Sequence, residues 1–529
     1  MRRRIALVLC CFLCLGGGAL AATVTGTDGP DRLRGTARAD AISGQGGADR
    51  ISGGAGGDLL DGGPGRDAIA GGTGNDRIAA AGDGAADTVA CGPGRDLVNA
   101  DAKDRVAGDC EVVSRRLSRD PYTSPESQHE TQVEPDSFAY GTTIVTAFQS
   151  GRFVRGGASG IGFATSLDAG GSWRSGVLPE LSASSTSAGP AERVSDPVVA
   201  FDAVHGTWLI ASLGVSGADT SIFVSRSRDG VRWERPVRAA VASTGELAYD
   251  KEWLACDNWQ SSPLRGRCYL SYTDLAGERL ATQSSSDGGA TWSAAVTGFS
   301  GPLTGAQPVA RPNGDLVVVF LARDELLSVR SGDGGGSFDP PARVAVLQAV
   351  DVRGLRDPPL PSIDAAADGT VLAAWHDCRF RAGCRANDIV VSSSADGVAW
   401  TRPRRLPLSP VGGRRGHFVP GLTVDPGSSR VAVAYHSLVD ASCPEDSCLA
   451  DVALVESLDG GKTWGRPERL SAQSMPLTWL ADTSLGRMLG DYISTSYVGG
   501  RAVPVFSLAS RPVGDALRQA ISATTRRRR

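Results

Sequence analysis

The first hundred residues of the chain carry an apolar position about every ninth residue, with one short insertion. Most of the residues between are glycine and small polar residues, as in GGAGGDLLD from Gly53. A regular short repeat of this kind is typical of parallel strands that stack into a coil and are joined by glycine-rich turns. We therefore predict a parallel β-roll over residues 23–114. Its apolar series is Leu33, Ile42, Ile51, Leu60, Ile69, Ile78, Val89 and Val98.

An aspartate stands two places before each apolar position of this repeat. One turn offers too few oxygen atoms for Ca²⁺, which takes six to eight, so turns eighteen residues apart are expected to share an ion. That pairs Asp49 with Asp67, and Asp58 with Asp76. The segment resembles the RTX (repeats-in-toxin) calcium-binding β-roll, which implies Ca²⁺ as its ligand. A disordered linker rich in glycine and aspartate would not explain the fixed apolar offset. The expected ligands are Asp31, Asp40, Asp49, Asp58, Asp67, Asp76 and Asp96.

A second repeat follows, in which short β-like runs such as SIFVSRS and DIVVSSS lead into Ser-x-Asp, glycine and an aromatic residue. This is the chemistry of a tight turn between strands, because aspartate caps backbone amides and glycine accepts a positive φ. The six copies are Ser166-Asp168-Trp173, Ser227-Asp229-Trp233, Ser285-Asp287-Trp292, Ser331-Asp333-Phe338, Ser394-Asp396-Trp400 and Ser457-Asp459-Trp464.

The six copies resemble the Asp-box, or bacterial neuraminidase repeat, of the sialidase superfamily. Their aspartates are 46 to 63 residues apart, which suits one four-stranded propeller blade per repeat. The resemblance implies an all-β chain with a six- or seven-bladed β-propeller over residues 129–512, in which these turns are structural. Residues 115–128 are then the linker between the β-roll and the propeller.

The two ends of the chain have their own signals. Residues 1–22 read as a secretory signal peptide, with a basic start, a short apolar stretch and a small-residue cleavage site. We expect a secreted, extracellular protein; lipidation at Cys10, Cys11 or Cys14 is the alternative. Residues 513–529 end in four arginines and are expected to be a flexible basic tail, with attachment to an anionic cell wall as the alternative.

Eight cysteines remain beyond the signal peptide. An even number in an exported chain favours disulfides, and pairing of nearest neighbours would staple one local loop each. Zinc binding is the alternative, but no CxxC motif or His/Cys cluster supports it. The cysteines are Cys91, Cys110, Cys256, Cys268, Cys378, Cys384, Cys443 and Cys448.

The overall charge limits the partners that we expect. A formal net charge of −4 gives no indication of nucleic-acid binding. No segment after the signal peptide is long and apolar enough to span a bilayer as a helix. We expect a monomer that binds calcium ions and meets extracellular glycans or cell-wall polymers.

Candidate chemistry gathers where the inner strands of a propeller would begin. The sialidase resemblance implies a tyrosine nucleophile assisted by glutamate, an aspartate acid/base and three arginines on an acidic sugar. The chain departs from that pattern, because residues 132–136 read QVEPD where the first arginine is expected. The catalytic candidates are Tyr492, Glu252 and Asp136, and the substrate-binding candidates are Lys251, Trp253, Arg379 and His417.

Three functions therefore remain open from the sequence. In the first, the propeller is a glycan-active enzyme, a hydrolase or lyase in which paired carboxylates supply acid and base. In the second, it is a non-catalytic module that binds sugar or protein, with tryptophans as stacking platforms. In the third, the chain is a structural surface protein that calcium makes rigid.

Overall fold

The computed structural model describes residues 22–185, 187–217, 219–243, 248–514 and 516–526. It is an all-β structure whose chain divides into two compact units. The first comprises Met1–Arg116, Leu470–Ser474 and Ala523–Arg529, and the second comprises Leu117–Arg469 and Met475–Ser522. Of the predicted signal peptide, all but residue 22 lies outside the described residues. Within the described part of the chain, no helix has the length and apolar character needed to cross a membrane.

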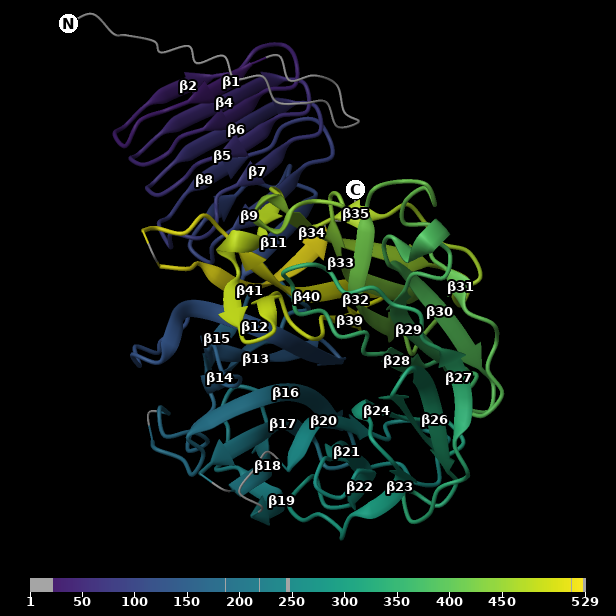
Figure 1. Ribbon diagram of the computed structural model, residues 1–529. Coiled ribbons are helices and arrows are strands. Elements are labelled where there is room, and N and C mark those ends of the chain that lie inside the picture. The colour runs from purple at the N-terminus through teal and green to yellow at the C-terminus, as the bar shows by residue number, and fades with distance from the viewer. Residues whose placement is uncertain (1–21, 186, 218, 244–247, 515, 527–529) are drawn as a thin grey trace, which may run out of the picture. The chain divides into compact units, whose positions relative to one another are not determined.

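The first unit contains the predicted parallel coil (Figure 1). Successive strands alternate between two parallel sheets, so that residues eighteen apart lie side by side, as Thr23 with Ala41 and Ala41 with Leu59. One sheet contains β1 (Thr23–Thr25), β3 (Ala41–Ser43), β5 (Leu59–Asp61), β7 (Arg77–Ala79), β9 (Leu97–Ala100) and β11 (Val112–Arg116). The other contains β2 (Arg32–Arg34), β4 (Arg50–Ala55), β6 (Ala68–Thr73), β8 (Thr88–Ala90) and β10 (Arg105–Val106).

The apolar repeat forms the core of this coil. From Ile42 to Val98 every member of the series is buried, and Val24 and Leu33 pack against the same cluster. Each turn contributes only one such side chain, so a single turn has no core, and stability comes from stacking. The sequence prediction of a β-roll is confirmed.

Among the described residues of the second unit, six sets of four consecutive antiparallel strands are arranged around a common centre (Figure 1). The first three are β12 (Ser127–Tyr140), β13 (Thr143–Phe153), β14 (Ala158–Ser166), β15 (Arg174–Val177); β16 (Arg193–Asp202), β17 (Thr207–Ser216), β18 (Asp219–Ser227), β19 (Val237–Ser243); and β20 (Tyr249–Cys256), β21 (Cys268–Asp274), β22 (Arg279–Ser285), β23 (Val296–Ser300). The others are β24 (Thr304–Ala310), β25 (Leu316–Ala322), β26 (Glu325–Ser331), β27 (Ala342–Val346); β28 (Ser362–Ala365), β29 (Val371–Asp377), β30 (Asp388–Ser394), β31 (Arg404–Arg405); and β32 (Gly416–Val424), β33 (Val431–Leu438), β34 (Leu449–Ser457), β35 (Glu468–Arg469).

The first strands of these sheets surround the centre as a closed ring. β12 contacts β16, which contacts β20, and the series continues through β24, β28 and β32. The hairpin of β39 (Ser494–Val498) and β40 (Arg501–Ala509) closes it, because β39 contacts both β32 and β12. The sheets are thus consistent with propeller blades, and side chains from seven inner strands can meet at one centre.

Shorter elements complete the second unit. β36 (Met475–Pro476) pairs with β34, and β37 (Ala481–Thr483) pairs with β38 (Gly486–Met488). Three single-turn 3₁₀ helices are η1 (Ala382–Cys384), η2 (Glu445–Ser447) and η3 (Leu477–Trp479). The end of the chain requires a correction: within the predicted flexible tail, β41 (Gln519–Arg526) is a strand whose first six residues are buried. Its alternation of small polar and apolar residues, QAISATT, suits a strand better than a solvated tail.

The six Ser-x-Asp turns connect the third and fourth strands of their sheets. In the turn at Asp333, Oδ1 accepts hydrogen bonds from the amides of Gly336 and Ser337, both 2.9 Å long, and Oδ2 accepts one from the Ser337 hydroxyl. Hydrogen bonds from Ser337 and Ser331 lower the pKa of Asp333 to about 2. Each copy therefore stabilises a turn, which is the structural role predicted for it.

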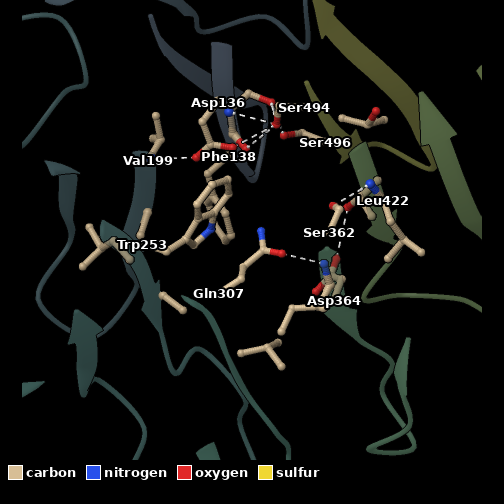
Figure 2. Close-up of a pocket in the computed structure, with 18 of the residues that line it drawn as sticks. Asp136, Phe138, Val199, Trp253, Gln307, Ser362, Asp364, Leu422, Ser494 and Ser496 are labelled. Carbon is tan, nitrogen blue, oxygen red and sulfur yellow. Dashed lines mark hydrogen bonds between the residues drawn. The ribbon is translucent and has the colours of Figure 1, made fainter. Parts of the chain in front are cut away.

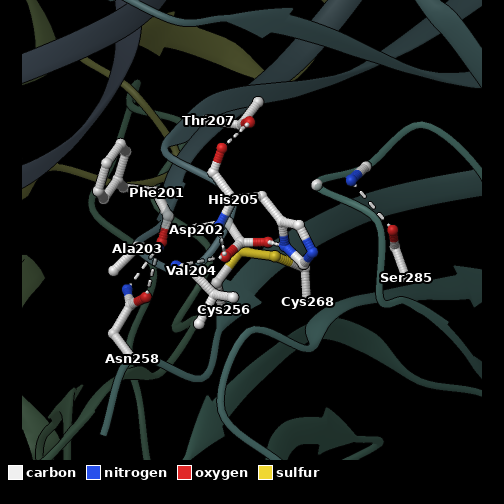
Figure 3. The surroundings of a disulfide bond; sticks show 12 residues. Phe201, Asp202, Ala203, Val204, His205, Thr207, Cys256, Asn258, Cys268 and Ser285 are labelled. Atoms are coloured by element: carbon white, nitrogen blue, oxygen red, sulfur yellow. Dashed lines mark hydrogen bonds and ion pairs between the residues drawn. A yellow bond between two sulfur atoms is a disulfide. The ribbon is translucent and has the colours of Figure 1, made fainter. Parts of the chain in front are cut away.

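Four disulfides connect the eight cysteines, each to its nearest neighbour as predicted: Cys91–Cys110, Cys256–Cys268, Cys378–Cys384 and Cys443–Cys448. Figure 3 shows Cys256–Cys268, which joins directly opposed residues of β20 and β21. Beside it Asn258 donates to the Phe201 carbonyl at 2.7 Å and accepts from the Ala203 amide at 2.8 Å. The disulfide thus supports a loop whose Asn258 side chain links two neighbouring sheets by hydrogen bonds.

Candidate functional site

The aspartates of the coil stack in the pairs that the sequence predicted. Oδ1 of Asp67 accepts a hydrogen bond from the backbone amide of Asp49 at 2.8 Å, and Oδ1 of Asp76 accepts one from Asp58 at 2.8 Å. These side chains are almost fully buried, with exposed fractions of 1–2%. One carboxylate oxygen of each aspartate therefore has a fixed structural role.

In the coil, Oδ2 of five buried aspartates has no hydrogen-bond partner among the described residues. Burial raises the pKa of Asp67 to about 7 and that of Asp87 to about 8. An unpartnered buried carboxylate oxygen is costly unless a cation neutralises it. The five are Asp49, Asp58, Asp67, Asp76 and Asp87.

Backbone carbonyls converge on the same points. A Cβ atom added to Gly53 would lie 2.3 Å from Asp58 Oδ2 and 2.4 Å from the Gly71 carbonyl oxygen. Gly44 stands in the same relation to Asp49 Oδ2 and the next carbonyl along the stack. Carboxylate and carbonyl oxygens that converge in this way suit a hard divalent cation such as Ca²⁺. Calcium would supply the positive charge that these buried oxygens lack.

The first two turns differ from the later ones. Oδ2 of Asp40 accepts hydrogen bonds from the amide and the hydroxyl of Thr36, and Oδ2 of Asp31 is held in the same way by Thr27. Asp31 and Asp40 were predicted as calcium ligands together with the others, but their oxygens already have protein donors. Conversely, the predicted ligand set omitted Asp87, which the insertion before it had displaced from the nine-residue spacing.

In the second unit, a buried ion cluster lies where the inner strands begin. Lys251 Nζ is 2.7 Å from Asp196 Oδ1, 2.7 Å from Asp491 Oδ2 and 3.3 Å from Glu134 Oε1. Arg356 forms a bidentate pair with Asp491, with one bond of 2.7 Å. We call Glu134, Asp196, Lys251, Arg356 and Asp491 the Lys251 cluster.

Local strain positions this cluster. Glu134, Asp196 and Lys251 have φ values of 53°, 50° and 49°, and each lies at a β-bulge of its inner strand. Residues other than glycine seldom adopt this conformation, so the surrounding structure must hold them there. The bulges turn the side chains of Glu134, Asp196 and Lys251, which lie on three different inner strands, toward one point.

Burial and charge pull the pKa values of the cluster in different directions. Burial would lower the pKa of Lys251, but Asp196, Asp491 and Glu134 outweigh it and raise that pKa well above its usual value. Burial would raise the pKa of Asp491, but Lys251 and Arg356 outweigh it and lower that pKa. Lys251 is therefore a buried cation engaged by three carboxylates.

A central cavity of about 320 Å³ adjoins the cluster (Figure 2). Its lining includes Lys251 and Asp491 at one end, both almost fully buried, and Tyr140, which is 43% exposed, at the other. Half-buried Trp253 also lines the cavity. The cavity is thus closed where the inner strands begin and opens where they end.

Polar side chains of this lining connect neighbouring inner strands (Figure 2). Asp136 Oδ2 accepts from the Val199 amide at 2.7 Å, and Asp364 Oδ2 accepts from the Val424 amide at 2.8 Å. Gln307 accepts from the Ile363 amide in the same manner. These bonds fix the cavity wall.

The remaining predicted site residues divide into two groups. Tyr492 lines the cavity with Trp253, their ring centroids 5.1 Å apart, and its hydroxyl donates to the Pro197 carbonyl at 3.1 Å. Glu252 is 1% exposed, and neither of its carboxylate oxygens has a partner among the described residues. Burial raises the pKa of both Glu252 and Tyr492 well above their usual values.

Arg379 and His417 lie outside the central cavity. Arg379 forms a bidentate ion pair with Asp377, with bonds of 2.8 and 2.6 Å, and is not a lining residue of the central cavity. His417 Nδ1 is 3.4 Å from Asp388 Oδ1, and His417 lines a second cavity, formed with the loops at residues 350–353, 385–387 and 438–443. The structure therefore brings together Tyr492, Lys251, Trp253 and Asp136, but not Arg379 or His417. Sequence reasoning missed Arg356, which no motif distinguishes from the other arginines.

Comparisons with known proteins agree with the description of the first unit. The family "RTX calcium-binding nonapeptide repeat (4 copies)" matches residues 25–60 and 61–98. A search of curated proteins found no match.

Solved structures give similarities at low identity. A Hadza microbial sialidase is 16% identical with a TM-score of 0.39, covering 58% of this chain and 63% of the sialidase. An α-L-arabinofuranosidase from Fusarium graminearum is 15% identical with a TM-score of 0.39, covering 61% of this chain and 92% of its own. An ulvan lyase of polysaccharide lyase family 25 is 11% identical with a TM-score of 0.43, covering 77% of this chain and 95% of the lyase.

From the family match at residues 25–60 and 61–98, the N-terminal region of the chain carries RTX calcium-binding repeats.

Proposed function

We propose that the protein is an extracellular glycan-binding protein in which calcium orders the N-terminal coil. The sugar would enter the central cavity from the end where the inner strands finish. We also infer that the six four-stranded sheets and the β39–β40 hairpin make seven blades.

The lining of the cavity supports a carbohydrate ligand. Trp253 and Trp259 present aromatic surface, and Ser362, Ser494 and Thr495 present hydroxyl groups. Sugar sites in general combine an apolar face with a few placed polar groups that fix orientation. The charged lining groups are Asp136, Asp364 and Asp491 against Lys251 alone, so the cavity suits a neutral sugar better than an anion.

One observation favours binding over turnover: each of the three carboxylates in the lining is already engaged by the protein. Asp136 and Asp364 accept from strand amides, and Asp491 pairs with Lys251 and Arg356. General acid–base catalysis needs a carboxyl group that can reach the substrate and exchange its proton. Asp136, one of the predicted catalytic residues, links β12 to β16 through the Val199 amide.

A glycosidase remains the second candidate because Glu252 and Asp136 lie near Tyr492. Glu252 and Asp136 are near enough to Tyr492 to raise the pKa of its hydroxyl further, after burial, Glu134 and Asp196. A tyrosine beside a glutamate is the arrangement that the sialidase resemblance implied for a nucleophile. Movement of Tyr492 away from Pro197 would be required before it could reach a sugar.

Neutral and acidic oligosaccharides presented on a glycan array to the calcium-loaded protein test the proposal. We expect binding of neutral sugars that Trp253→Ala weakens by about tenfold or more, since a stacking aromatic contributes a large share of such contacts. Leu485→Ala, a change at a side chain that is 69% exposed, serves as the control. Hydrolysis of aryl glycosides that Tyr492→Phe and Glu252→Gln abolish would instead support the enzyme. Absence of both binding and turnover would contradict both candidates.

A further inference from the structure

A second cavity of about 320 Å³ lies in the same unit, formed by three loops. They are residues 350–353 before β28, residues 385–387 before β30, and residues 438–443 after β33. Gly416 and His417, at the start of β32, also line it. The volume is at the lower end of the range of small-molecule pockets, about 300–1,000 Å³.

The wall of this cavity is held in place from several sides. Asn387 accepts from the Val350 amide at 3.0 Å and donates to the Val350 carbonyl at 2.6 Å. Arg385 directly follows the Cys378–Cys384 disulfide, and Cys443, itself part of the lining, is bonded to Cys448. A site that is rigid before binding loses less entropy when a ligand arrives.

The charge of the lining is opposite to that of the central cavity. Arg353 and Arg385 both line it, together with one acidic residue, Asp351. Among the described residues, neither guanidinium is paired with a carboxylate. Arg385, which is exposed, donates to the Ala382 carbonyl at 3.0 Å. Arginine offers a planar fork that matches a carboxylate or a sulfate, so two such groups in one cavity suit an oxyanion.

His417 adds a polar group that is almost fully buried, with 1% of its side chain exposed. Its Nδ1 faces Asp388, which Arg381 and Arg405 hold in place with bidentate pairs. Because Nδ1 faces Asp388, Nε2 is the ring nitrogen that the proposed site would use. Burial lowers the pKa of His417, so the ring is neutral near pH 7 and Nε2 can accept a hydrogen bond.

We propose that this second cavity binds the acidic residue of a saccharide, with Arg353 and Arg385 on its carboxylate or sulfate group and His417 Nε2 accepting from a sugar hydroxyl. A hydroxyl donor and an oxyanion on one small ligand are the features of a uronic acid or a sulfated sugar. The site is separate from the central cavity and does not depend on what that cavity binds.

The test compares two sugars that differ in one group. D-glucuronate carries a carboxylate where D-glucose carries a hydroxymethyl group, so titration of the calcium-loaded full chain with each, followed by NMR, isolates the oxyanion. We expect millimolar or tighter binding of glucuronate. The double variant Arg353→Gln/Arg385→Gln should weaken that binding at least tenfold, because hydrogen bonds to charged groups contribute strongly. Trp253→Ala should leave it unchanged, which separates this site from the central cavity.

Arg402→Gln, at an exposed arginine outside both cavities, is the matched control and should bind glucuronate as the unaltered protein does. His417→Gln should weaken glucuronate binding while leaving the affinity for inorganic sulfate within about twofold, because sulfate has no hydroxyl to donate. Equal affinity for glucuronate and glucose would overturn the proposal. So would unchanged glucuronate binding in the double arginine variant.

Discussion

Lys251 on β20 and Asp491, just before β39, form an ion pair of 2.7 Å in which both side chains are almost fully buried. Asp196 and Glu134 share the same ammonium group, so removing it leaves three buried carboxylates facing one another, with Arg356 and Arg152 as the cations beside them. Removing one partner of a buried pair typically costs about 3–5 kcal/mol. We expect Lys251→Met to lower the unfolding free energy by at least that range, measured as a lower thermal midpoint.

Lys462→Met is the matched control for that experiment. Lys462 is exposed in the last Ser-x-Asp turn, where a surface substitution should change stability by about 0.5 kcal/mol or less. If both variants melted at the same temperature, the cluster would not be the structural centre that we describe.

The repeats made much of this architecture predictable. A nine-residue spacing fixes which residues stack, so the coil, its core and the Asp49–Asp67 pairing followed from the sequence alone. The Ser-x-Asp turns similarly marked where the third strand of each sheet ends, because that turn chemistry is local. Nearest-neighbour disulfides followed for the same reason.

Contacts between distant strands were not predictable in the same way. Lys251 meets Glu134, Asp196 and Asp491 because bulges on separate inner strands turn these side chains to one centre, and no local pattern encodes that meeting. Asp136 was predicted as catalytic because it is acidic and near an inner strand's start, but its oxygens serve the Val199 amide and Ser494.

The two kinds of aspartate in the coil should respond differently to substitution. Asp58 Oδ2 has no protein donor, whereas Asp40 Oδ2 already accepts from Thr36. We expect Asp58→Asn to lower the number of calcium ions bound, as isothermal titration measures it, and to reduce the gain in thermal midpoint with calcium. Asp40→Asn is the control and should keep the calcium stoichiometry. Equal losses in the two variants would contradict the assignment of ligands by unpartnered oxygens.

The close approach of Gly53 to the Asp58 carboxylate gives a second test, which leaves every aspartate intact. An alanine Cβ at position 53 would lie 2.3 Å from Asp58 Oδ2, so Gly53→Ala should displace the carboxylate and reduce calcium binding at that turn. At Gly29 the nearest atom to such a Cβ is 3.8 Å away, so Gly29→Ala should bind calcium normally. Calcium titration followed by circular dichroism compares the two variants. Indistinguishable titrations of Gly53→Ala and Gly29→Ala would argue against an ion site beside Gly53.

The Cys256–Cys268 disulfide closes a segment of 12 residues, and its removal should be measurable. Loop-closure entropy predicts that Cys256→Ser/Cys268→Ser costs about 3 kcal/mol, against about 2 kcal/mol for Cys443→Ser/Cys448→Ser, whose sequence separation is 5. Thermal melting ranks the two double variants. A larger loss from the shorter loop would show that native contacts, rather than chain entropy, decide the cost.

Buried Asp357 predicts a pH dependence of stability whose sign is fixed. Burial raises its pKa to about 8, and Oδ2 has no hydrogen-bond partner among the described residues. Above pH 4 the unfolded chain releases this proton while the folded protein keeps it, so the contribution of Asp357 to stability falls as pH rises to about 8 and then levels off.

Asp357→Asn mimics the protonated carboxyl group and does not titrate. The variant should therefore match the unaltered protein near pH 4 and exceed its unfolding free energy by on the order of a few kcal/mol at pH 9. Melting curves from pH 4 to 9 test this, with Asp324→Asn, an exposed carboxylate, as the control for the loss of one charge. A variant that was destabilised equally at both ends of this range would show that Asp357 is ionised in the folded protein and holds the 350–357 loop through its charge.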